Sequence, residues 1–79
     1  MMETIKQLGA YVEKRRNQLR MTQKGLCNLA GISDATLRGI EQGKPGVAIK
    51  NWAAVADVLG LELKFSVKRM SDETRKGNE

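Results

Sequence analysis

Gly31 joins two short helical patterns, and this junction constrains the fold of the chain more than any other feature of the sequence. Thr22 suits the N-cap of the first helix, in which Leu26, Leu29 and Ala30 recur at the spacing of one buried face. A glycine adopts the left-handed or tight conformation that ends a helix at little steric cost. We therefore expect a helix after Thr22 that buries all three apolar residues and stops at Gly31.

The second helical pattern starts directly after this glycine. Ser33 suits its N-cap, Leu37 and Ile40 are its inward residues, and Gly43 ends it. Two helices joined by so short a turn form a helix-turn-helix, which places its second helix in the major groove of DNA. The pattern therefore predicts a nucleic-acid-binding motif.

A longer signature supports this motif. Residues across the two helices fall in register on it: Thr22, Gln23, Leu26, Gly31, Ile32, Ser33, Leu37, Ile40, Glu41 and Gly43. On these positions the chain resembles the lambda-repressor-like (Cro/C1, XRE) DNA-binding family, and the resemblance extends through Leu59. It implies an all-α fold of about four or five helices over residues 1–60.

Composition limits the other classes of function. The chain has 79 residues and a net charge of +5, which suit one small domain with a polyanionic partner. It has a single cysteine, Cys27, and no histidine, so we expect a reducing cytoplasm, no metal site and no cofactor. The carboxylates are scattered and no nucleophile lies beside a base, so we expect no enzyme activity. Cys27 is expected to be a small buried thiol.

The first helix, within residues 3–20, contains one charged residue on its apolar side. Its apolar residues keep helical spacing: Ile5, Leu8, Val12 and Leu19. Arg16 occupies the remaining position of this stripe, and Glu41 lies beside the inward Ile40 of a later helix. Because an unpaired buried charge is very costly, Arg16 and Glu41 are expected to pair, as the family resemblance also implies. The alternative is that either side chain extends to solvent.

The pattern changes after a loop at residues 44–46. A fourth helix follows with inward residues at helical spacing: Ile49, Trp52, Val55, Ala56 and Leu59. Gly60 ends this helix, Ala48 offers it no side-chain cap, and Trp52 is expected in the core, not as a base-stacking platform.

Residues 61–69 alternate as a half-buried β-strand does. The apolar positions are Leu61, Leu63, Phe65 and Val67, and charged or polar residues lie between them. An isolated strand needs a partner, so we expect the same strand of a second subunit to pair with it, as in the HipB-like antitoxins that this chain resembles. The alternatives are an extended tail or a fifth helix packed on the same domain. Residues 70–79 are expected to be a disordered tail.

The resemblance also implies the DNA contacts. Phosphate or backbone contacts are expected from Gln23, Ser33, Lys44, Lys50 and Asn51. Gln23 also suits a base contact that braces the recognition helix, or a merely exposed place at the start of its helix, and Lys50 and Asn51 also suit a merely solvated face. The residues expected near base edges are Asp34, Ala35, Thr36 and Arg38. Arg38 can bond a guanine twice, and Ala35 can touch a thymine methyl. Asp34 suits cytosine recognition and helix capping equally. Some relatives carry a base-reading side chain at the position of Gly39, so this glycine reduces the number of bases that the second motif helix can recognise.

We therefore expect a cytoplasmic, nucleoid-associated transcriptional regulator that binds a palindromic operator as a homodimer. A narrower expectation is a HipB-like antitoxin that represses its own operon and binds a HipA-like toxin kinase. The alternative is a protein-interaction module without specific DNA binding.

Overall fold

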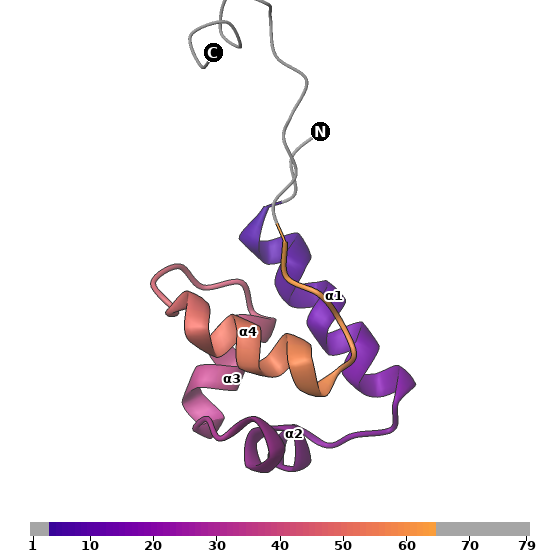
Figure 1. Ribbon diagram of the computed structural model, residues 1–79. Coiled ribbons are helices and arrows are strands. Elements are labelled where there is room, and N and C mark those ends of the chain that lie inside the picture. Colours follow the sequence, from indigo (N-terminus) through magenta and orange to yellow (C-terminus); the bar gives the residue numbers. More distant parts are fainter. Residues whose placement is uncertain (1–3, 65–79) are drawn as a thin grey trace, which may run out of the picture.

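The computed structural model describes residues 4–64, which form four helices (Figure 1). These are α1 (Ile5–Gln18), α2 (Gln23–Ala30), α3 (Asp34–Glu41) and α4 (Ile49–Val58). No strand occurs within residues 4–64, so the first four positions of the expected dimerising strand, 61–64, are not in a strand here. The rest of that strand and the expected tail lie outside the described residues. None of the four helices is long and apolar enough to cross a membrane.

Side chains cap three of the four helices. Thr4 begins α1 with a reciprocal capping box, in which the Thr4 backbone amide donates a hydrogen bond to Gln7 Oε1 at 2.8 Å. Thr22 accepts a bond from the third residue of α2, and Ser33 does the same for α3. Helix α4 starts at Ala48 without a side-chain cap. Local sequence signals therefore determine where most of these helices begin.

The helices enclose one small core. Helix α1 packs against α3, while α2 packs against both α3 and α4. All four helices contribute to the core: Val12, Leu26, Cys27, Leu37, Ile40, Val55 and Leu59. Trp52 packs against this cluster from α4 and is half-buried.

The expectation that Leu29 is buried is wrong, because 66% of this residue is exposed. Leu26 and Cys27 are both buried in α2, so the inward face is centred between them. At about 100° per residue, Leu29 lies roughly 110° from that centre, whereas Ala30 lies almost on it. The apolar spacing of α2 is compatible with burial of either Leu29 or Cys27. The packing of α2 against α3 and α4 buries the side that contains Cys27.

The predicted apolar stripe of α1 is only partly buried. Val12 is buried, but Ile5, Leu8 and Leu19 remain exposed by more than a third. The buried positions of α1 are Gly9, Val12 and Arg16, which face α3. Ile5 and Leu8, near the start of α1, instead line an apolar groove beside α4.

Two glycines set the distance between α1 and the end of α3. A Cβ atom on Gly9 would collide with the Ile40 carbonyl oxygen and approach the Glu41 oxygen and the Gly43 nitrogen to 3.0 Å each. Gly43 has a φ of 71°, and a Cβ there would collide with the backbone of Lys6. The two backbones thus touch directly, and no other residue fits at either position without movement.

Candidate nucleic-acid interface

The turn between α2 and α3 is fixed by backbone and core contacts. Gly31 has a φ of 72°, and its amide and that of Ile32 both bond the Cys27 carbonyl, at 2.8 and 3.1 Å. Ile32 packs against the core, and Ser33 then caps α3. The second helix is therefore held in one orientation relative to the first, as a helix-turn-helix requires.

One face of α3 is open to solvent. Asp34, Arg38 and Gln42 are exposed and follow one another at intervals of four residues, with Ala35 exposed beside them. Leu37 and Ile40 point into the core on the other side. Gln42 is not among the residues expected from the sequence, although its spacing of four from Arg38 indicates that it shares this face.

Gly39 does not belong to that exposed face. It is buried, and a Cβ atom there would lie 3.4 Å from the Val47 side chain. The expectation that Gly39 limits base reading is therefore wrong, because a side chain at this position would point toward Val47.

The first turn of α3 is braced by two hydroxyl groups. The Thr36 amide donates to the Ser33 hydroxyl at 3.1 Å, and the Ser33 hydroxyl donates to that of Thr36 at 2.9 Å. Thr36 is partly buried and held in place by this pair. The hydroxyls of Ser33 and Thr36 therefore already have partners within the domain, and the hydroxyl proton of Thr36 is left for an external acceptor.

A buried ion pair lies behind the start of α2. Arg16 donates to Glu41 through Nε at 2.7 Å and Nη2 at 3.2 Å, and to the Met21 carbonyl at 2.8 Å. These are the two residues that the sequence analysis paired, and their side chains are only 9% and 4% exposed. The hydrogen bond with Glu41 raises the pKa of Arg16, against the opposing effect of burial. The pair joins α1 to the end of α3.

Gln23 is attached to the same ion pair. Its Nε2 donates to Glu41 Oε1 at 2.9 Å, although the residue itself is exposed at the first position of α2. One hydrogen of the Gln23 side-chain amide thus bonds within the domain, while the side-chain oxygen and the other hydrogen can bond an external partner. The ion pair therefore holds the Gln23 amide at the surface in a defined position.

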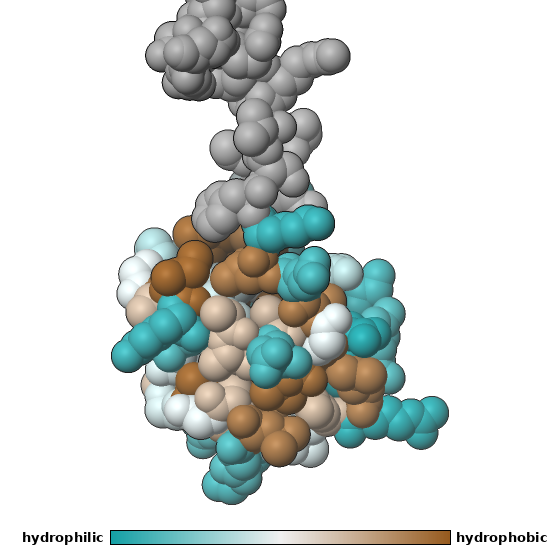
Figure 2. Space-filling view, viewed as in Figure 1, coloured by the Kyte–Doolittle hydropathy of each residue, from teal (hydrophilic) through white to brown (hydrophobic). Residues whose placement is uncertain are grey.

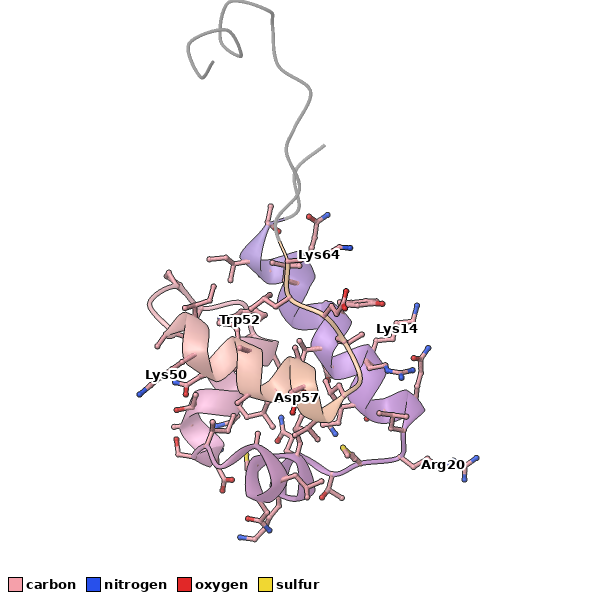
Figure 3. The ribbon with its side chains drawn as sticks, viewed as in Figure 1. Lys14, Arg20, Lys50, Trp52, Asp57 and Lys64 are labelled. Carbon is pink, nitrogen blue, oxygen red and sulfur yellow. The ribbon has the colours of Figure 1, made fainter. Side chains whose placement is uncertain are left out.

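Basic side chains lie on the same side of the domain as α3. Lys44 and Lys50 are exposed, and Asn51 beside them is half-buried. Figure 3 shows Lys50 projecting outward next to α3, whereas Arg20 projects from the opposite side of the domain. Arg15 also turns away, since its Nε donates to the Leu59 carbonyl at the end of α4, at 2.9 Å. Positive charge is therefore supplied near α3 by the lysines and Arg38.

Comparison with known proteins agrees with this geometry. Residues 7–63 match the family model described as "Helix-turn-helix domain". The chain belongs to this helix-turn-helix family. A search of curated proteins returned no match. Among solved structures, one named "MDT Protein" is similar with a TM-score of 0.75 and 20% identity, over 87% of this chain and 97% of that one. At this identity the likeness supports the fold alone.

The helix-turn-helix domain thus presents its predicted residues on α2, α3 and the loop and helix that follow. Asp34, Ala35 and Arg38 share the exposed face of α3, and Gln23 lies at the start of the neighbouring helix. Lys24, which is exposed next to Gln23, was not selected from the sequence. A basic residue in the first turn of α2 could have indicated from the sequence alone that Lys24 lies near the phosphate backbone.

Cys27 of the helix-turn-helix domain is a buried core residue. The residue is 4% exposed, and its sulfur lies 3.6 Å from the Ser33 carbonyl. Burial raises the pKa of the Cys27 thiol, and the nearby Asp34 raises it further. The thiolate that reacts with oxidants and alkylating agents is therefore suppressed.

We expect Cys27 to resist alkylation in the folded protein near neutral pH and to react rapidly once urea unfolds it. Mass spectrometry after timed labelling with iodoacetamide measures both rates. Because the pKa is raised in the folded state, the unfolded chain loses this proton first as pH rises. Stability should therefore fall once pH exceeds the ordinary thiol pKa of about 8.5. Equal labelling rates with and without urea would contradict this environment.

Proposed function

We propose that this helix-turn-helix domain is a sequence-specific transcriptional regulator, acting as a repressor that binds a palindromic operator as a homodimer. The observation that carries the proposal is the exposed face of α3 with Arg38 at its middle, held rigidly by the core and the motif turn. Shared family membership supports DNA binding, and the basic residues beside α3 suit a phosphate backbone.

Base reading is assigned to α3. Arg38 has the guanidinium geometry that donates two bonds to a guanine, and Ala35 offers a methyl group to thymine. Thr36 contributes its remaining hydroxyl proton or its methyl group. Asp34 keeps its two roles, acceptance from cytosine and stabilisation of the first turn of α3.

Phosphate contacts are assigned to groups around α3: Gln23, Lys44, Lys50, Asn51 and the backbone amide of Ser33, whose hydroxyl proton is already donated to Thr36. Gln23 is the most strongly supported, because its hydrogen bond to Glu41 positions the amide before DNA arrives. A side chain that is already ordered loses less conformational entropy on binding.

The dimer is assigned to residues 61–69, with Leu61, Leu63, Phe65 and Val67 as its apolar side. Two domains related by a two-fold axis would then place their α3 helices in successive major grooves, about 34 Å apart. In the narrower form of the proposal the protein is a HipB-like antitoxin that represses its own operon and binds a HipA-like toxin kinase. Copurification of a kinase-like partner from the native host tests this form, and its repeated absence would count against it.

Replacing Arg38 by alanine is expected to weaken operator binding by about 1–3 kcal/mol and to relax the preference at one base position. The reason is that a bidentate contact to guanine distinguishes bases as well as adding affinity. Titration of operator and scrambled duplexes by fluorescence anisotropy measures both effects. An equal loss on both duplexes would remove Arg38 from base reading.

Lys44→Ala is the matched control, because Lys44 is also an exposed cation beside α3. Operator and scrambled DNA should lose affinity alike, since a phosphate contact carries no sequence information. The slope of log K against log salt should become shallower by about 0.9 for each lost phosphate contact. If no variant of the α3 surface changes any binding activity, the protein-interaction alternative takes its place.

A further inference from the structure

An apolar groove lies between the start of α1 and α4. The start of α1 is at the end of the domain that is farthest from α2 (Figure 1). It has a volume of about 390 Å³. Its apolar lining comes from Ile5, Leu8, Val47, Ile49, Trp52 and Leu63. Of these, Ile49 is 61% exposed and Leu63 is 42% exposed. Figure 2 shows hydrophobic surface in this part of the molecule, over α4 and the adjoining end of α1. The domain thus leaves uncovered several side chains that a core would normally bury.

The chain itself leads through this groove. After α4 ends, Leu61 packs against the core and Leu63 lines the groove. Residues 61–64 run along α1 toward its first turn, as Figure 1 shows. The chain therefore reaches the edge of the described domain at the point where the alternation of apolar residues is only half complete.

The next apolar residues of the pattern are Phe65 and Val67. At about 3.3 Å per residue they would lie roughly 7 and 13 Å beyond Leu63 if the chain stays extended. Within residues 4–64, α1 begins at Ile5 beside Leu63 and no helix continues farther in that direction. In an extended conformation these two side chains would therefore lie beyond the described helices, and the groove of the same domain would stay open.

We propose that the groove of each protomer receives Phe65 of a second copy, and that the exchange is reciprocal about a two-fold axis. An isologous contact of this kind buries both apolar groups at once, because each copy carries Phe65 directly after the segment that lines its own apolar groove. This inference rests on the dimer of the proposed function and adds to it the surface that receives residues 61–69 of the second copy.

Charge complementarity supports a second copy as the occupant. Antiparallel pairing about Leu63 places Glu62 opposite Lys64 of the second copy, and pairing about Phe65 places it opposite Lys68 of the second copy. Both registers keep the apolar residues on one side of the two-stranded ribbon, and each opposes an acid to a base. The polar side of the segment is therefore self-complementary as well.

Trp52 is the only tryptophan of the chain, so its fluorescence reports directly on the groove. The test combines sedimentation velocity of the full chain without DNA with Trp52 emission over a range of protein concentrations. We expect a dimer whose formation shifts the emission to shorter wavelength. Phe65→Ala and Ile49→Asp should each weaken association on the order of tenfold or more, because both remove contacts at the centre of the interface.

Leu29→Asp is the matched control, because Leu29 is equally exposed on α2 and lies outside the groove. It should leave the association unchanged, and circular dichroism verifies that each variant is folded. A dimer that survives both Phe65→Ala and Ile49→Asp would overturn the proposal by placing the interface elsewhere. A monomer would also overturn it: if Phe65→Ala shifts the monomer's Trp52 emission to longer wavelength, the groove is covered by the same chain. Operator selection is measured separately, so a monomer that still selects DNA would leave the DNA-binding proposal standing.

Discussion

Replacing Glu41 by alanine is expected to destabilise the domain by about 3–5 kcal/mol, the typical cost of leaving one partner of a buried ion pair without the other. Arg16 would keep its charge in a site where its side chain is only 9% exposed, with the Met21 carbonyl as its remaining partner. A domain of this size has a total stability of only about 5–10 kcal/mol, so the variant should be largely unfolded at moderate urea concentrations. Urea unfolding followed by circular dichroism measures the change.

The double variant Arg16→Met with Glu41→Leu separates the charge from the space it occupies. It should recover most of the lost stability, because apolar residues of similar volume often replace a buried ion pair at little cost. Gln23→Ala is the control for the outer hydrogen bond to Glu41, and it should cost no more than about 1 kcal/mol since Gln23 is exposed. A loss below about 1 kcal/mol for Glu41→Ala would show that Arg16 reaches solvent instead.

Replacing Gly9 by alanine is expected to destabilise the domain by about 2–3 kcal/mol, against the usual direction for this substitution. Inside a helix, alanine is ordinarily more stable than glycine by about 1 kcal/mol. Here the added Cβ would collide with the Ile40 carbonyl oxygen, so α1 must move away from the end of α3. The shift in the midpoint of urea unfolding measures the effect.

Gly39→Ala provides the matched control for this prediction. Gly39 is also a buried glycine inside a helix, but the nearest atom to its added Cβ is the Val47 side chain at 3.4 Å. This variant should be unchanged or more stable by up to about 1 kcal/mol. If both variants gained stability, the backbone contact between α1 and α3 would not be as close as described.

The ends of the motif helices were predictable from the sequence because their signals are local. Thr22, Gly31 and Ser33 act through hydrogen bonds and backbone conformations within a few residues of themselves. The four-helix, all-α character of the described residues followed from these signals and from apolar spacing. The expected strand had no such local support within residues 61–64, where none forms.

The misses depend on contacts between distant parts of the chain. Leu29 and Cys27 both fit a helical stripe, and only the position of α3 and α4 determines which is buried. The requirement for glycine at position 9 could not be predicted from the sequence, because it arises where α1 crosses the end of α3. The bond from Gln23 to Glu41 likewise joins residues 18 positions apart. Spacing rules describe one helix at a time and contain none of this information.

Selection of bound sequences from a random duplex pool, repeated at two salt concentrations, tests most directly whether α3 reads DNA sequence. We expect enrichment of an inverted repeat at both salt concentrations, with half-sites about one helical turn apart. Weaker total binding at the higher salt is expected, because the phosphate contacts release counterions. Retention without any enriched sequence, lost at the higher salt, would contradict the account and leave only a basic helical domain.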